Sequence, residues 1–179
     1  MDILDIIKQS LASNPNLNDD IRSKFNNLIS ILRKKLPDVD LTRLNERLKT
    51  VKFGKIGKYE RKGTYFYDVF KNEILFSRDL EENYDIDNLF MKAILEMSTS
   101  TDSFTGFNSD ERLRALNLAY TEILATFLIG NEGSSDLEEE MLITNLLSHI
   151  VGKETSYNSY FSNDGVPIIK ALQEVEAGM

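Results

Sequence analysis

The chain has 179 residues, of which 41% are hydrophobic and 28% are charged, so it is long enough and apolar enough to fold around its own core. Its formal net charge of −8 repels phosphate backbones, which argues against a nucleic-acid partner. The chain contains no cysteine, and this excludes disulfides, thiolate metal sites and cysteine nucleophiles.

The first residues indicate where the protein resides. Residues 1–5 are acidic and amphipathic, and they lack the basic segment and long apolar run of a signal peptide. No stretch of the sequence approaches the length of a membrane span. We therefore expect a cytoplasmic protein without a membrane partner, while export without a cleaved signal stays open.

A group of basic residues interrupts the acidic composition: Lys52, Lys55, Lys58, Arg61 and Lys62. Only one aromatic residue, Tyr59, interleaves with them, whereas surfaces that bind single-stranded nucleic acid stack bases on several aromatic rings. We interpret the group as a charged hairpin that keeps a sheet edge soluble.

Helical periodicity and helix-end signals predict three helices in the N-terminal part of the chain, residues 1–48. They are expected at residues 3–12, from about residue 18 to a stop at Pro37, and from a cap at Asp40 to about Leu48.

Between residues 49 and 77 the spacing of the apolar residues changes from helical to alternating. A first segment around Val51 to Ile56 has the spacing of a bent strand, and Thr64 to Val69 is rich in aromatic and β-branched residues. A turn at Lys71-Asn72 then leads into a further strand from Glu73 to Ser77. These segments predict a small antiparallel sheet.

Helical patterns return in the second half of the chain. Helices are expected from a cap at Asp85 or Asp87 to about Met97, and at 111–129, 136–151 and 165–175, with polar loops at 98–110 and 131–135. The 111–129 helix has the broadest apolar stripe, so we expect Leu116, Tyr120, Ile123, Leu124 and Phe127 to be buried.

These elements predict one mainly helical α+β domain over residues 1–179. Its small antiparallel sheet packs on a helical core. It would consist of N-terminal helices (1–48), a core (49–130) and C-terminal helices (131–179).

Four segments within residues 45–130 follow a particular order. They are a strand pair with Gly63–Asp68 and Asn72–Phe76, a helix with Leu89–Ser98, the stretch Thr105–Phe107, and a long helix with Ala115–Glu122. This order resembles the zincin metallopeptidases, in which an edge hairpin precedes a helix with His-Glu-x-x-His and a later helix carries an Asn-Glu-x-x-Thr-Glu type of segment. The chain end, with Ile150–Glu154 and Tyr160-Phe161, is similar to the ends of bacterial zincin-like proteins of unknown function.

At the positions that the resemblance assigns to His-Glu-x-x-His, this chain has residues that are neither histidine ligands nor a general base. The first histidine falls at Lys92, the general-base glutamate at Ala93 and the second histidine at Glu96. A zincin requires two neutral imidazoles on one helix face and a carboxylate that deprotonates the bound water. Lys92 would bring positive charge to the metal's position, and Ala93 cannot take a proton.

On the later helix the resemblance is partly retained. The carboxylate ligand falls at Leu118, which we expect to fill its place with apolar bulk, whereas Asn117 and the supporting acid Glu122 remain. We expect the Lys92 ammonium to substitute for the lost metal charge by pairing with Glu122, Glu96 or both. The alternative is a solvated surface pair between Lys92 and Glu96, which are four residues apart.

The only histidine lies outside the motif. His149 continues the face of Leu142 and Leu146 at helical spacing, so we expect it to be a partly buried core residue and not a catalyst.

These assignments predict a catalytically inactive zincin-like domain with no cofactor, which acts as an interaction or structural module with a protein or peptide partner. Two alternatives stay open: a hydrolase with a non-zinc carboxylate site containing Glu96 and Glu122, and an unrelated α+β binding module. The sequence leaves the oligomeric state open.

Overall fold

The structure is a computed structural model, and it describes residues 1–55, 65–76, 86–130 and 137–179. The helices are α1 (Ile3–Ser13), α2 (Asp19–Lys35), α3 (Thr42–Leu48), α4 (Ile86–Ser98), α5 (Arg114–Ile129), α6 (Glu138–Val151), α7 (Lys153–Ser162) and α8 (Val166–Ala177). The strands are β1 (Lys52–Lys55), β2 (Tyr65–Asp68) and β3 (Glu73–Phe76), and a 3₁₀ turn, η1 (Glu111–Leu113), precedes α5. None of the helices in these ranges has the length and apolar character that crossing a membrane requires.

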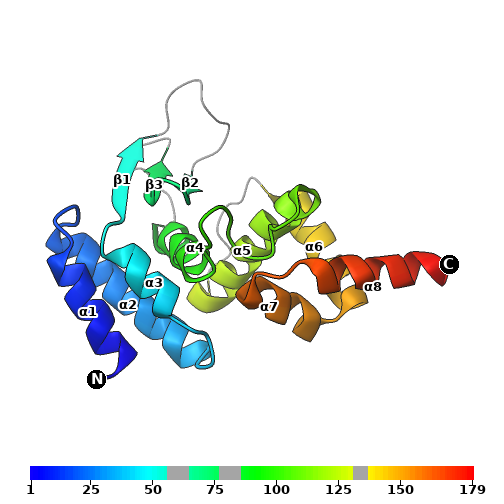
Figure 1. Ribbon diagram of the computed structural model, residues 1–179, viewed down its shortest axis with the longest axis horizontal. Coiled ribbons are helices and arrows are strands. Elements are labelled where there is room, and N and C mark those ends of the chain that lie inside the picture. The colour runs from blue at the N-terminus through cyan, green and yellow to red at the C-terminus, as the bar shows by residue number, and fades with distance from the viewer. Residues whose placement is uncertain (56–64, 77–85, 131–136) are drawn as a thin grey trace.

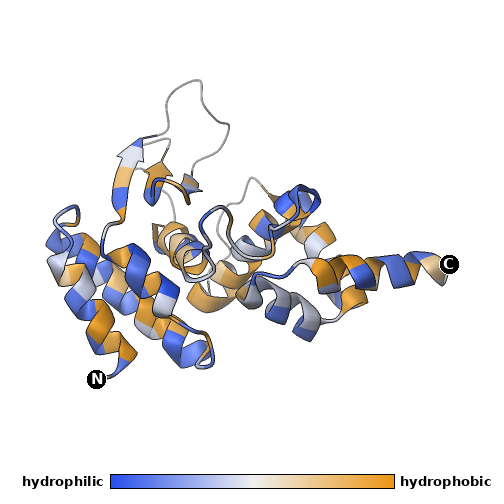
Figure 2. Ribbon diagram, in the orientation of Figure 1, coloured by the Kyte–Doolittle hydropathy of each residue, from blue (hydrophilic) through white to orange (hydrophobic). Residues whose placement is uncertain are grey.

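The elements form three groups around the central helices α4 and α5 (Figure 1). Helices α1–α3 lie on one side, the sheet lies above α4, and α6–α8 lie on the other side, with α8 extending outward to the C-terminus. The colours of Figure 2 show alternating polar and apolar stripes along α1–α3, while α4 is mostly apolar. This agrees with the burial of nearly every residue of α4 from Asn88 to Ser98.

The predicted N-terminal helices are confirmed, with small differences at their ends. The Asn18 side chain accepts a hydrogen bond of 2.9 Å from the Ile21 amide and so begins α2. Acids in the first turn of α2 and the basic residues 33–35 in its last turn complement the helix dipole. Helix α2 then buries Phe25 and Leu32 in the core that it shares with α1 and α3.

The sheet has the strand order β1-β3-β2 and is mixed, so the prediction of an antiparallel sheet is wrong for β1. Strands β2 and β3 pair antiparallel, with Tyr65 opposite Phe76, because a short turn connects them. Strand β1 pairs parallel with β3, with Lys52 opposite Glu73. This arrangement leaves β1 and β2 as the two edge strands, and β2 contacts helix α4.

Aromatic side chains join the sheet to the helices beneath it. The rings of Phe53 (β1) and Phe76 (β3) stack at 6.0 Å, and Phe90 of α4 lies 5.6 Å from Phe53. Phe25 of α2 reaches the same cluster at 5.1 Å from Phe90. The prediction that the sheet packs on this helix is therefore confirmed.

Helix α5 runs beside α4, as predicted, but it turns a different face to the core. Tyr120 and Leu124 are buried, Leu116 and Ile123 are half-buried, and Phe127 is 58% exposed, so the expected burial of Phe127 is wrong. The buried face includes polar residues instead: Asn117, Thr121 and Glu122.

The C-terminal part contains a helix that the sequence did not predict. Helix α7 has a polar composition with little periodicity, yet it inserts the fully buried Tyr160 against Phe107 and Tyr120. The prediction for His149 is wrong, because its side chain is exposed on α6 together with Leu142 and Leu146.

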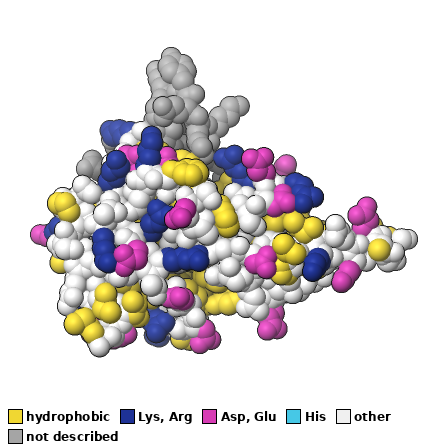
Figure 3. Space-filling view, in the orientation of Figure 1, with side chains coloured by type: hydrophobic (Ala, Val, Ile, Leu, Met, Phe, Trp, Pro, Cys, Tyr) yellow, Lys and Arg dark blue, Asp and Glu magenta, His cyan; other side chains and the backbone are white. Residues whose placement is uncertain are grey.

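The predicted basic group is only partly within the described residues. Lys52 and Lys55 lie exposed on β1, whereas Lys58, Arg61 and Lys62 lie outside the described residues. On the face in Figure 3, basic and acidic side chains are interspersed.

Candidate functional site

A cleft of about 840 Å³ lies between the edge strand and the two central helices. One wall is β2 with the turn to Phe70, and the opposite wall contains Phe104, Asn108 and Leu118. Glu96 of α4 also lines the cleft and is almost fully buried. The cleft therefore combines aromatic walls with one buried carboxyl group.

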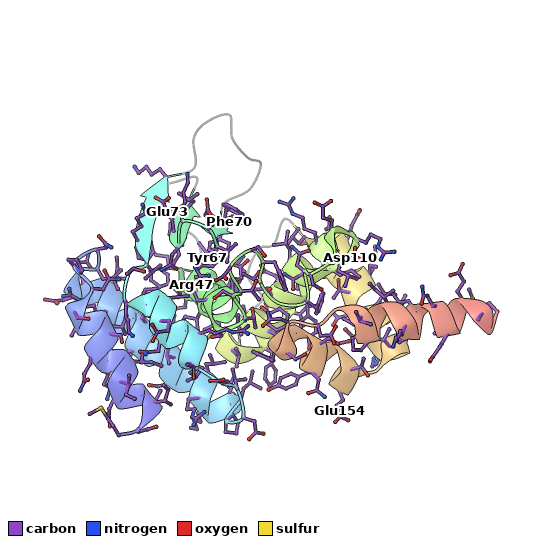
Figure 4. The ribbon with its side chains drawn as sticks, viewed as in Figure 1. Arg47, Tyr67, Phe70, Glu73, Asp110 and Glu154 are labelled. Atoms are coloured by element: carbon purple, nitrogen blue, oxygen red, sulfur yellow. The ribbon has the colours of Figure 1, made fainter. Side chains whose placement is uncertain are left out.

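The end of the sheet that borders the cleft is fixed by an arginine from the N-terminal helices. Arg47 of α3 donates hydrogen bonds to the Val69 carbonyl (2.8 Å), the Thr101 carbonyl (2.6 Å) and the Ser100 hydroxyl (3.1 Å). Figure 4 shows Arg47 beneath the β2–β3 hairpin near Tyr67, with Phe70 further out. These bonds hold both walls of the cleft to α3.

Lys92 and Glu122 form an ion pair that joins α4 to α5. The lysine Nζ lies 2.7 Å from Glu122 Oε2, and the two side chains are only 15% and 3% exposed. The predicted pairing of Lys92 with Glu122 is confirmed, and the interpretation of Lys92 with Glu96 as a solvated surface pair is wrong. Lys92 Nζ also lies 5.3 Å from the centre of the Tyr65 ring, within range of a cation–π contact.

Glu96 has a different partner, Tyr65 on strand β2. The Tyr65 hydroxyl donates a hydrogen bond to Glu96 Oε2. Burial raises the pKa of the Glu96 carboxyl to about 7, and the Tyr65 hydrogen bond and the nearby Lys92 charge only partly oppose this rise. Burial, together with the charge of Glu96, also raises the pKa of the Tyr65 hydroxyl well above its ordinary value.

Asn117 shapes the loop that borders the cleft. Its Oδ1 accepts a hydrogen bond of 3.0 Å from the Phe107 amide, and the Gly106 amide donates to the Thr99 hydroxyl at 2.9 Å. Gly106 has a φ of 56°, and a Cβ there would lie 2.0 Å from Asn117 Oδ1. The loop therefore requires glycine at this position, and Asn117 has a structural role.

The remaining positions that the resemblance assigns to the zinc motif differ in burial. Ala93 is fully buried in the core, whereas Leu118 is exposed and lines the cleft. The expectation that Leu118 fills the ligand's place with apolar bulk stays a prediction, and its side chain contributes apolar surface to the cleft. His149 lies on α6, which contributes no residue to the cleft.

Two residues of the site were not foreseen from the sequence. Tyr65 was predicted only as part of a strand, although a tyrosine on an edge strand is a signal for a polar contact at its tip. Tyr160 shares a hydrogen bond of 2.9 Å with Thr121, and its helix has no periodicity that would have revealed it.

The residues at the cleft do not fit the zinc ion that the resemblance implies. Zinc is held by imidazole, thiolate or carboxylate ligands, whereas the residue that the resemblance assigns to the first ligand, Lys92, carries an ammonium group that pairs with Glu122. Within the described ranges, no three His, Cys, Asp or Glu residues gather where they could hold a metal ion.

Comparison of the chain with protein-family models, curated proteins and solved structures found no match.

Proposed function

We propose that this chain is a catalytically inactive zincin-like domain that binds an extended peptide in the cleft beside β2. The observation that carries the proposal is the Lys92–Glu122 ion pair. It lies at two positions that the resemblance assigns to the zinc site, while the neighbouring cleft stays open. The chain thus combines the cleft of a peptide-binding fold with residues that cannot hold its metal.

The edge position of β2 supports a peptide ligand. Extended peptides bind many domains by lying along an edge strand, where the backbone gives affinity and side-chain pockets give specificity. Strand β2 is one of the two edge strands of the described sheet, and its residues line the cleft. No residue of α1–α3 contributes to the cleft, so these helices do not cover this wall.

The charges around the cleft favour a peptide with a basic side chain. Three acids line it, Asp68, Glu96 and Glu111, against one arginine, Arg114. Lys92 is committed to Glu122, so Glu96 lacks an ion-pair partner among the described residues. A lysine or arginine of the ligand would supply that partner, while the aromatic walls contact apolar neighbours in the peptide.

Fluorescence anisotropy with a positional-scanning library of labelled hexapeptides tests the proposal. We expect binding that favours lysine or arginine at one position, and we expect Glu96→Gln to remove this preference because the amide keeps the shape but carries no charge. Glu174→Gln, exposed on α8, is the matched control and should leave peptide binding unchanged. Failure of all peptides to bind, or equal binding by Glu96→Gln, would count against the proposal.

A second candidate, a hydrolase that uses Glu96, is favoured by one observation. A carboxyl group with a pKa of about 7 can both donate and accept a proton at neutral pH. Carboxylate hydrolases such as glycosidases, however, use two acids on either side of the reacting bond, and Glu122 is sealed in its ion pair. Hydrolysis with a pH dependence near 7 that Glu96→Gln abolishes would favour this candidate.

A further inference from the structure

Helix α6 exposes apolar side chains to solvent. Leu142, Ile143, Leu146 and Ile150 are 72%, 52%, 60% and 45% exposed. The same helix buries Thr144 against the rest of the domain. A surface helix normally places its apolar side chains inward, so the exposure of these four on α6 calls for an explanation.

The exposed side chains form one continuous stripe. Leu142, Leu146 and Ile150 follow each other at intervals of four residues, which places them on one face of a helix. Ile143 lies next to this line, and no residue of α6 lines the cleft. The stripe is therefore a second surface, separate from the proposed peptide site.

We infer that α6 pairs antiparallel with α6 of a second copy of this chain, about a two-fold axis at Leu146. In such a pairing each residue lies opposite the residue at the same distance on the other side of the axis. Leu142 of one copy then faces Ile150 of the other, and the two Leu146 side chains meet. The exposed stripe of each copy is thus covered by the same stripe of the other copy.

The charges at the two ends of α6 favour this orientation. The first turn carries Glu138, Glu139 and Glu140, and the other end is followed by Lys153, which is exposed. Antiparallel pairing about Leu146 brings the acidic first turn of one copy toward the end of the other copy's α6, which Lys153 follows, and it sets the two helix dipoles antiparallel to each other. A parallel pair would instead bring the acids of both copies together. The same acids disfavour an anionic membrane surface as the occupant of this face.

The absence of cysteine from the chain permits a direct test. Leu146→Cys introduces a single thiol at the expected axis, and mild oxidation should give a disulfide-linked dimer, because residues at a two-fold axis come within disulfide range. Asn145→Cys is the matched control, since it is also exposed but points about 100° away around the helix. We expect it to cross-link at least tenfold more slowly.

Sedimentation equilibrium of the unmodified chain gives an independent measurement. We expect a monomer–dimer equilibrium that Leu146→Glu shifts fully to monomer while the helix content measured by circular dichroism stays unchanged. Glu139→Lys should weaken the dimer, and Glu139→Lys combined with Lys153→Glu should restore it. A chain that stays monomeric at millimolar concentration, or equal cross-linking at positions 145 and 146, would overturn the inference.

Discussion

Lys92 and Glu96 lie one turn apart on the same helix, yet they have separate partners. Lys92 reaches across to α5 and pairs with Glu122, whereas Glu96 accepts a hydrogen bond from Tyr65 on the sheet. Two buried acids are therefore stabilised by two mechanisms, one by an opposite charge and one by hydrogen bonding with partial protonation. The two mechanisms predict different responses to mutation.

Removing only the lysine of the ion pair should cost more than removing both charges. Lys92→Met keeps the aliphatic stem but leaves Glu122 buried without its partner, and we expect a loss of about 3 kcal/mol in the free energy of unfolding. Lys92→Met with Glu122→Gln removes both charges and should stay within about 1 kcal/mol of the unmodified chain. Urea unfolding of both variants and of Lys92→Ala measures this order.

The reverse order would contradict this account. If the double variant were as unstable as Lys92→Met, the cost would come from losing the contacts of the Lys92 ammonium group and not from an unpaired Glu122 carboxylate. The pair would then have no special role in joining α4 to α5.

Glu96 predicts a pH dependence of stability with a definite sign. Its pKa rises from an ordinary 4.5 to about 7 in the folded protein, so between these values the folded state holds more protons than the unfolded state. Stability therefore falls as pH rises from 4.5 to 7, by about 3 kcal/mol for this group. Glu96→Gln should lack this component, and the difference between the two pH–stability curves isolates it from all other titrating groups.

A difference curve that stays flat between pH 4.5 and 7 would show that Glu96 keeps an ordinary pKa. Tyr65→Phe serves as a further control, because loss of the hydrogen bond that favours the carboxylate should move the midpoint upward.

At the scale of elements, the sequence predicted what depends on local periodicity. Helices α2, α4 and α5 have clear apolar stripes and were placed within a few residues. The pairing of β1 with β3 joins residues that are far apart in the sequence, and no local pattern indicates its direction. Its parallel orientation was therefore not predicted. Helix α7 was missed because its Ser, Asn and Tyr residues give little period, although Tyr160 is among the most buried side chains.

The candidate site was predictable only in part, for the same reason. The resemblance brought Lys92 and Glu122 together, and the structure confirms their contact. The partner of Glu96, in contrast, comes from a strand, and the direction of the apolar stripes on α5 and α6 depends on which neighbours the fold supplies. A stripe identifies a face, but it does not identify what covers that face.

Helix α5 offers a direct test of which face is inward. Leu124→Ala should cost about 2–5 kcal/mol, because Leu124 is buried and its removal leaves a cavity. Phe127→Ala should cost less than about 1 kcal/mol, because the ring is exposed and its main described contact is Lys35 Nζ at 5.5 Å from its centre. Thermal and urea unfolding of the two variants should separate them clearly, and equal costs would mean that the helix is rotated.

In the whole molecule, the site depends on all three parts of the chain. The N-terminal helices contribute Arg47, the central part contributes the cleft, and the C-terminal helices contribute Tyr160. Tyr160 packs edge-on to Phe107 at 5.9 Å between ring centres and so supports the loop at the cleft. The single domain over residues 1–179 stays a prediction, and this shared framework supports it.

The last prediction concerns the response of the whole molecule to zinc. An ion that binds only the folded state must raise the melting temperature. Because Lys92 pairs with Glu122 at the position that the resemblance assigns to the first zinc ligand, we expect no rise with zinc in the unmodified chain. If the resemblance to zincins is correct, three substitutions that restore only the ligands, Lys92→His, Glu96→His and Leu118→Glu, should create a zinc site beside Glu122. At a hundredfold excess of zinc over its dissociation constant, zinc should stabilise the folded triple variant by about 2.7 kcal/mol, which raises its melting temperature by roughly 5–10 °C for a chain of this length.

Differential scanning fluorimetry of both proteins, with magnesium as the control ion, measures the change in melting temperature. A zinc-dependent rise in the unmodified chain would contradict the proposal that this chain holds no zinc at these positions. The absence of a rise in the correctly folded triple variant would mean that the three positions do not correspond to zincin ligands.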